Sequence, residues 1–334
     1  MADFRFLKNM VSKQWVVSAP RRAKRPNIGQ GSVQLCPFCV GQEKREQEVY
    51  RVGGKTGDSN WHIRVLKNHF PFARIHELII HSPDHHKNFD ELPFSQVELI
   101  LQTYRQRYNV HKDAGQVYIF HNRGIGGGES LPHPHTQLVV VPKEVNMEIS
   151  PLDTSIYRIE SGMRNQESWE KHKKESLIHN SLFLIQKTQS KTIGSPQIPR
   201  NDVLCTDHFF IFCPDTSEWP DEVWIAPKKN GKGFGAITAD QISDLGFCLS
   251  RLIQILDIRH GHEFPFNFYI YPGNQWYLRI IPRIKILGGF EVGTHIIVNT
   301  QDPKETFAFI KEHFWEPDIE KIRGEHQAEY WRAV

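Results

Sequence analysis

The chain has few cysteines, little net charge and no long hydrophobic run, and each shortage excludes a class of protein. Five cysteines among 334 residues are too few for a disulfide-rich secreted fold, and an odd number cannot all pair within the chain. We therefore expect a reducing compartment. A formal net charge of +3 gives no general attraction to nucleic acid or to a membrane surface, so we expect neither partner. No stretch approaches the run of about 18 apolar residues that a membrane span needs, and the amino terminus lacks the apolar core of an export signal. We therefore expect a cytoplasmic protein.

The rest of the composition is that of a folded globular protein. Hydrophobic residues make up 39% of the chain and charged residues 24%, which is enough for one large domain or two ordinary ones. Positive charge gathers in one place, at Arg21, Arg22, Lys24 and Arg25. Taken alone, this cluster is equally compatible with a solvated face and with a site for an anion.

The most informative segment is 130–137, which reads SLPHPHTQ. Alternate side chains of an extended strand point to the same face, so His133, His135 and Gln137 would line one surface. Neutral imidazole is nucleophilic at pH 7 and leaves phosphorus readily, so a histidine in this row can accept and return a nucleotidyl group. Gln137 has no titratable proton and can only hold a phosphoryl oxygen in place. The row therefore favours group transfer over hydrolysis.

A glycine-rich loop precedes this segment and strengthens the interpretation. Its glycines are Gly124, Gly126, Gly127 and Gly128. Their backbone can approach a ligand closely, and Asn122 and Ser130 at the edges of the loop are neutral hydrogen-bond donors. An isolated His-x-His pair would more often be an exposed pair beside an edge strand, and the loop and Gln137 argue against that alternative.

Two of the cysteines form a Cys-x-x-Cys pair, Cys36 and Cys39. A redox pair is one interpretation, but no strand and helix of a thioredoxin-like unit surround it. A tight turn of this kind presents two thiolates to one tetrahedral metal ion, which favours a zinc site. The remaining cysteines, Cys205, Cys213 and Cys248, lie in apolar surroundings and are predicted to be small buried hydrophobic residues.

The order of predicted elements repeats once along the chain, with an offset of about 140 to 150 residues. In the first half the elements are a strand at 75–81, a helix opened by a Ser95–Glu98 capping box, and strands near 117–120 and 137–141. In the second half they are a strand at 223–226, a helix opened by a Thr238–Gln241 capping box, and strands near 268–271 and 277–281. A last helix follows Asp302 and Pro303. We predict two α+β units, each an antiparallel sheet with a packed helix, fused edge to edge.

Several blocks of the sequence resemble the galactose-1-phosphate uridylyltransferase family of the histidine-triad superfamily. The most specific is SLPHPHTQ, with Asn122 eight residues before Ser130, which is similar to the active-site signature of the family. The other blocks follow in the family's order at 15–26, 36–39, 67–71, 82–85, 281–283 and 289–291. The resemblance implies two fused histidine-triad-like units. We expect a catalytic unit with a zinc site at 1–150, a polar connector at 151–200, and a degenerate unit at 201–334.

The second unit lacks the histidines of the first. Laying Pro282 over Pro142 places Gln275 opposite His135, so only the first unit can be catalytic. Many members of the family carry histidines at this second position that help to bind another metal ion. We therefore expect no second metal site in this chain.

The resemblance also implies a mechanism. His135 attacks the α-phosphorus of a nucleoside diphosphate hexose, and a second hexose 1-phosphate then takes the nucleotide from the nucleotidyl-histidine. The His133 carbonyl could accept a hydrogen bond from His135 Nδ1, which leaves Nε2 to attack. Gln137 and Ser130 would hold the phosphoryl oxygens.

The binding residues are likewise implied by the resemblance. The zinc ligands would be Cys36, Cys39, His85 and His133, in a closed structural site. His81 and His86 compete with His85 for the third position. The nucleotide pocket would contain Arg22, Arg25, Asn68 and Asn122. Lys285 and Glu291 would belong to a sugar pocket that a partner subunit completes, so we expect a homodimer.

Two alternatives stay open. A phosphorylase of the same superfamily, acting on nucleoside diphosphate sugars or dinucleoside polyphosphates, would use a similar histidine row with inorganic phosphate as acceptor. A zinc-stabilised nucleotide-binding protein without turnover would keep the pocket and not the chemistry. The sequence fixes neither the base nor the hexose nor the acceptor, because base discrimination depends on a few pocket contacts.

Overall fold

The computed structural model describes residues 4–24, 35–152, 203–229, 231–319 and 322–323. Arg25 and all but the first two residues of the predicted connector lie outside these ranges. The central feature is a ten-stranded sheet with the order β3-β4-β5-β7-β6-β11-β12-β10-β9-β8. Each neighbouring pair in it is antiparallel.

Each half of the chain supplies five consecutive strands of this sheet. The first half gives β3 (Glu48–Val52), β4 (Ile63–Lys67), β5 (His76–Ile80), β6 (Gln116–Arg123) and β7 (His135–Val141). The second half gives β8 (Leu204–Cys205), β9 (Phe209–Phe212), β10 (Val223–Pro227), β11 (Phe266–Ile270) and β12 (Leu278–Pro282). The strand order of one half mirrors the order of the other.

The two halves meet where β6 pairs with β11, in a register that sets Asn122 opposite Asn267. The predicted α+β class and the edge-to-edge fusion of the two antiparallel sheets are therefore confirmed. The boundaries drawn at residues 150 and 200 stay predictions, because most of the stretch between them lies outside the described ranges.

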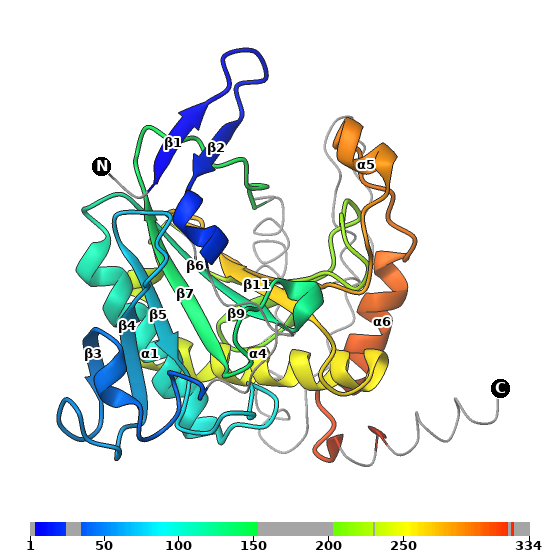
Figure 1. Cartoon of the computed structure of the whole chain (residues 1–334). Coiled ribbons are helices and arrows are strands. Elements are labelled where there is room, and N and C mark those ends of the chain that lie inside the picture. The colour runs from blue at the N-terminus through cyan, green and yellow to red at the C-terminus, as the bar shows by residue number, and fades with distance from the viewer. Residues whose placement is uncertain (1–3, 25–34, 153–202, 230, 320–321, 324–334) are drawn as a thin grey trace.

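Helices cover one face of the sheet. They are α1 (Phe94–His111), α4 (Ala239–His260) and α6 (Pro303–His313), and α4 runs along the sheet in Figure 1. In β7, Leu138 and Val140 point into the core shared with these helices, while Val139 and Val141 join a separate cluster on the other face. This alternation places the odd-numbered residues of β7, including His135 and Gln137, on the face away from the helices.

Two of the three predicted helix N-caps are confirmed. Thr238 and Gln241 form the predicted capping box at the start of α4, and Asp302 accepts a hydrogen bond from the amide of Lys304 at the start of α6. The Ser95 capping box is wrong. Helix α1 begins at Phe94 after Pro93, so Ser95 already lies inside the first turn and cannot serve as the cap.

Smaller elements stand on the side of the sheet away from α4, as Figure 1 shows. They include the hairpin of β1 (Arg5–Lys8) and β2 (Trp15–Ser18), the 3-10 turn η1 (Pro20–Lys24) and the short helix α5 (Gly289–Thr294). The sequence did not predict this hairpin, nor β3, β4, β8 and β9. Within the described ranges, every helix is too short or too polar to cross a bilayer.

Cysteine burial follows the prediction for two of three residues. Cys213 and Cys248 are buried, and Cys205 on the edge strand β8 is half-buried.

The glycine loop after β6 contains the 3-10 turn η3 (Ile125–Gly127) and packs directly on the second half. A Cβ atom at Gly127 would lie 2.8 Å from the carbonyl oxygen of Phe266 in β11, which is closer than real Cβ atoms come. We expect Gly127→Ala to push the loop away from β11 and to lower the free energy of unfolding by about 1–3 kcal/mol, as overpacking does. Gly293→Ala, which meets no atom within 4 Å, is the control. Urea unfolding measures both, and equal stability of the two variants would refute the tight contact.

Candidate active site and metal cluster

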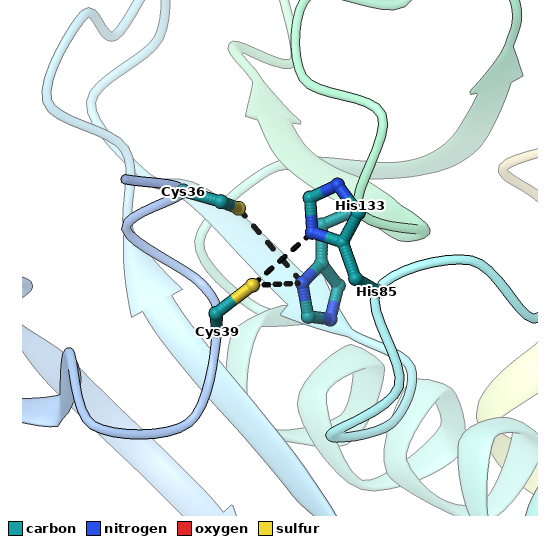
Figure 2. A group of neighbouring side chains, drawn as sticks. All are labelled: Cys36, Cys39, His85 and His133. Atoms are coloured by element: carbon teal, nitrogen blue, oxygen red, sulfur yellow. Dashed lines mark hydrogen bonds between the residues drawn. The ribbon is translucent and has the colours of Figure 1, made fainter. Parts of the chain in front are cut away.

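Four side chains from three separate segments meet at one point. Cys39 Sγ lies 3.1 Å from His85 Nδ1 and 3.6 Å from His133 Nδ1, and Cys36 Sγ lies 3.9 Å from His133 Nδ1 (Figure 2). All four ligand atoms lie within 4.8 Å of one another. Around a tetrahedral zinc ion, sulfur and nitrogen ligands stand about 3.5 Å apart, given Zn–S and Zn–N bonds of about 2.3 and 2.0 Å. The cluster therefore has the size of a zinc coordination shell.

The surroundings of the cluster suit a cation. His133 Nε2 lies 2.9 Å from the carbonyl oxygen of Ser82 and can only donate to it, which leaves the lone pair of Nδ1 for a metal ion. Burial raises the pKa of the Cys36 thiol to about 11 and lowers the pKa of His133 to about 4. Without a metal ion both groups are thus neutral at pH 7. A divalent cation would stabilise the thiolates that burial disfavours.

The neighbouring histidines do not enter the cluster. His81 is fully buried and its Nε2 lies 2.8 Å from the hydroxyl of Thr136. His86 is exposed, with its ring edge against His85 at 4.8 Å between centroids. Among the described residues, His85 is therefore the histidine that joins His133 and the two cysteines.

The ring of His135 is oriented by the same segment that supplies His133. His135 Nδ1 lies 2.9 Å from the carbonyl oxygen of His133, so Nδ1 carries the proton and the lone pair resides on Nε2. The side chain is buried, with 5% exposed, and the edge of Phe38 packs against it at 5.3 Å between centroids. The geometry therefore assigns the proton to Nδ1 and the lone pair to Nε2.

A buried polar group supports His135 from the helix side of the sheet. The hydroxyl of Thr136 lies 2.8 Å from His81 Nε2 and 2.5 Å from the hydroxyl of Tyr104 in α1. His121 Nδ1 lies 3.0 Å from the carbonyl oxygen of His135. Burial lowers the pKa of His121 to about 3 and the pKa of His81 well below its usual value. Both rings are therefore neutral at pH 7 and serve as fixed hydrogen-bond partners, which the sequence did not predict.

Gln137 lies beside a histidine that the sequence analysis did not single out. Gln137 Oε1 is 2.9 Å from His76 Nε2, and Asn68 Nδ2 is 3.0 Å from the same nitrogen. Arg22 reaches this group from η1, because its Nη1 donates to the carbonyl oxygen of Phe70 at 2.6 Å. The structure thus brings together Arg22, Asn68 and Gln137. The only sequence signal for His76 was a polar residue at the start of a strand whose last three residues are apolar.

Asn122 is held by the second half of the chain. Asn267 Nδ2 donates to Asn122 Oδ1 at 2.9 Å and to the carbonyl oxygen of Gly127 at 2.7 Å. Arg283 donates to Asn267 Oδ1 at 3.0 Å, which fixes the orientation of that amide. The oxygen of Asn122 is therefore occupied and its amino group is available to a ligand. Ser130 is half-buried at the end of the loop.

Lys285 and Glu291 contact each other in the segment 284–298, which contains α5 and is called the α5 arm below. Lys285 Nζ donates to Glu291 Oε1 and to the carbonyl oxygen of Val298. The Lys285 ammonium and the amides of Gly288 and Val298 lower the pKa of Glu291 to about 2. In Figure 1, α5 lies across the sheet from β7. Within a single chain, the helix α5 and the strand β7 therefore stand apart.

In the matching region of the second half, other side chains take the place of the histidine row, and Glu222, Trp224 and Arg279 line a cavity there. Trp224 of β10 stacks on Tyr277 at 4.2 Å, and Arg279 of β12 pairs with Glu222 at 2.7 Å. A second group that could hold a metal ion is Asp90, Asp257 and His262. Its carboxylates already pair with arginines, Arg123 and Arg323, both at 3.1 Å. These counter-charges make it a salt-bridge cluster.

Comparison with known proteins agrees with this arrangement. Residues 75–141 match the model of the galactose-1-phosphate uridyl transferase amino-terminal domain. An ADP-glucose phosphorylase of Arabidopsis thaliana is 26% identical over 91% of this chain and 92% of its own length. A galactose-1-phosphate uridylyltransferase of Thermotoga maritima is 22% identical over 93% and 98%. A crystal structure of the Arabidopsis phosphorylase with bound ADP-glucose superposes with a TM-score of 0.60 at 24% identity, covering 92% of this chain and 99% of that one. A uridylyltransferase structure superposes with a TM-score of 0.63 at 19% identity, covering 92% and 98%.

We expect the purified protein to carry about one zinc ion, since two cysteines and two histidines complete a tetrahedral shell. Cys36→Ser should reduce the bound zinc and lower the melting temperature together, because metal binding contributes to folding. Metal analysis by mass spectrometry and thermal unfolding measure the two effects. Cys205→Ser, outside the cluster, is the matched control. Full zinc content in Cys36→Ser, or none in protein purified without chelator, would contradict the site.

Proposed function

We propose that the chain is a member of the galactose-1-phosphate uridylyltransferase family and that it moves a nucleotidyl group from a nucleoside diphosphate hexose to a phosphorylated acceptor. The intermediate is a nucleotidyl-histidine on His135. One observation carries the proposal. The 2.9 Å contact from His135 Nδ1 to the His133 carbonyl orients the buried imidazole so that Nε2 is the nitrogen proposed to attack.

The transfer takes two displacements at phosphorus. His135 Nε2 attacks the α-phosphorus, a phosphorus–nitrogen bond forms, the bond to the bridging oxygen breaks, and hexose 1-phosphate leaves. An acceptor phosphate oxygen then attacks the same phosphorus, and the nitrogen leaves with its electron pair. Gln137 and Ser130 hold the non-bridging oxygens while charge shifts. Gln137 cannot take a proton from water, so hydrolysis of the intermediate is slow.

A zinc ion held by Cys36, Cys39, His85 and His133 would supply structure and no step of the reaction. It would fix His133, and through Pro134 it would fix the backbone that orients His135. Zinc-binding thiolates require a reducing environment, which supports the cytoplasm as the location.

Amide groups form the proposed nucleotide pocket together with Arg22 and Arg25. The oxygen of Asn68 accepts from the amide of Phe70 at 2.8 Å, and the oxygen of Asn122 accepts from Asn267. With their oxygens engaged, both side chains offer N–H groups to the phosphates of the ligand. The positive charge of the arginines adds to this preference for an anion.

The proposed sugar pocket needs a second subunit. Apolar side chains are exposed along the α5 arm, among them Ile286 at 93%, Val292 at 62% and Phe290 at 57%. Side chains of this kind on one projecting arm favour contact with another protein surface. We propose a homodimer in which this arm brings Lys285 and Glu291 to the active site of the partner chain.

Hexose 1-phosphate is the acceptor we propose first, because a lysine and a carboxylate suit phosphate and sugar hydroxyls. Inorganic phosphate is the second candidate, as in a nucleoside diphosphate sugar phosphorylase. Two observations favour inorganic phosphate as the acceptor. The identity with the ADP-glucose phosphorylase is 26%, against 22% with the Thermotoga uridylyltransferase. Both carboxylate oxygens of Glu291 already accept hydrogen bonds within the arm.

Replacing the proposed nucleophile should abolish the covalent intermediate. We expect His135→Ala to form no nucleotidyl adduct with any member of a panel of nucleoside diphosphate hexoses, while the fold persists. Intact-mass spectrometry detects the adduct, and His313→Ala on the distant helix α6 is the control. An adduct in His135→Ala, or one that maps to His133, would contradict the assignment. Absence of an adduct from the wild-type protein would favour a nucleotide-binding protein without turnover.

The rate at which each acceptor removes the nucleotide from that adduct identifies the acceptor. We expect hexose 1-phosphate to discharge it faster than inorganic phosphate at equal concentration. Glu291→Ala should slow the first reaction about 10-fold or more, since a hydrogen-bonded charged group is lost, and affect the second less. Rapid-quench measurement of both rates decides. If inorganic phosphate discharges the adduct faster and Glu291→Ala affects both rates alike, the results would support a phosphorylase and contradict the transferase.

A further inference from the structure

His76 occupies a buried position between Gln137 and the loop that follows β4. It opens β5, where it pairs with Val139 of β7, so it lies diagonally across the ladder from Gln137. His76 is 2% exposed and Gln137 6%. Their contact at 2.9 Å is therefore shielded from water, and the orientation of the Gln137 amide depends on which proton His76 carries.

The surroundings of the ring select one tautomer. The backbone amide of Phe72 points at His76 Nδ1 at 3.4 Å, and an amide N–H can only donate. Nδ1 therefore holds the lone pair, and Nε2 holds the proton of the neutral ring. Nε2–H then donates to Gln137 Oε1.

The opposite tautomer meets more repulsion. With the proton on Nδ1, two N–H groups would face each other at Phe72, and the lone pair of Nε2 would face Gln137 Oε1. Against these two unfavourable contacts, its Nε2 lone pair would accept from Asn68 Nδ2 at 3.0 Å. In the favoured tautomer, the oxygen of Asn68 accepts from the amide of Phe70, and the one unfavourable contact is between the Asn68 amino group and Nε2–H at 3.0 Å.

We propose that His76 is a positioning residue that holds the Gln137 amide with its amino group toward the phosphoryl group on His135. The inference rests on the proposed function. A reversed amide would set its oxygen against a phosphoryl oxygen, which repels instead of stabilising the developing charge. His76 thereby decides whether Gln137 assists the displacement.

The same ring couples the catalytic amide to the nucleotide side of the site. Arg22 binds the carbonyl oxygen of Phe70 at 2.6 Å and lies over the ring of Phe72 at 4.9 Å. Phe72 in turn packs edge-on against His76 at 4.5 Å between centroids. A ligand that orders Arg22 therefore also restrains the ring that orients Gln137.

The test uses the zinc-loaded protein and a matched pair of variants. His76→Phe keeps a ring against Phe72 and removes the donor, whereas His76→Gln keeps an N–H that can reach Gln137. We expect His76→Phe to slow single-turnover adduct formation about 10- to 100-fold, the loss typical of a group that orients another. His76→Gln should recover most of that loss. Zinc content and melting temperature should match the wild-type protein in both.

Two further readouts separate positioning from a structural role. Nitrogen-15 NMR of labelled histidines should show His76 protonated on Nε2. In addition, His76→Phe combined with Gln137→Ala should react no more slowly than Gln137→Ala alone, because both changes remove the same interaction. Independent, multiplying losses or a proton on Nδ1 would overturn the proposal.

The outcome stays interpretable if the wild-type protein forms no adduct. That result would refute the proposed function, while the NMR spectrum would still decide the tautomer of His76. Calorimetric titration with nucleoside monophosphates would then replace the rate. Weaker binding in His76→Phe than in His76→Gln would support the orienting contact, and equal binding would refute it.

Discussion

The position of His133 is the constraint on which the rest of the site depends. Its Nδ1 faces Cys36 and Cys39, its Nε2–H donates to the carbonyl oxygen of Ser82, and its own carbonyl accepts from His135. One residue thus connects the metal cluster to the orientation of the proposed nucleophile. Because the two histidines are separated by Pro134 alone, a shift of the cluster would move the attacking nitrogen.

The second half of the chain lacks the histidines and still supports the site. Through the β6–β11 pairing, Asn267 holds both Asn122 and the carbonyl oxygen of Gly127, and Arg283 fixes Asn267. In the region of its own sheet that matches the His135 row, Trp224 stacks on Tyr277 and the described residues include no histidine. Fusion of the two halves therefore lets one unit carry the proposed active site while the other holds the glycine loop of that unit in place.

The two faces of strand β7 carry different parts of the proposed site. Along β7, His135 and Gln137 lie on the face away from the helices. Thr136 between them faces α1 and contacts Tyr104 and His81. The polar contacts on the helix side leave His81 and His121 neutral, since burial disfavours their charged forms. The backbone of the proposed nucleophile is thus anchored from the rear by groups that do not titrate near pH 7.

The sequence by itself determined the local features. Periodicity located α1, α4, β7 and β12, and the spacing of Cys36 and Cys39 and of His133 and His135 indicated a metal site beside a nucleophile. Only the tertiary structure decided that His85 and not His81 or His86 joins the cysteine cluster, that His76 contacts Gln137, and that Asn267 holds Asn122. These depend on strand register and on contacts between residues far apart in the chain, which no local pattern encodes. The Ser95 cap failed because α1 begins at Phe94, one residue before the motif, with Pro93 as its N-cap.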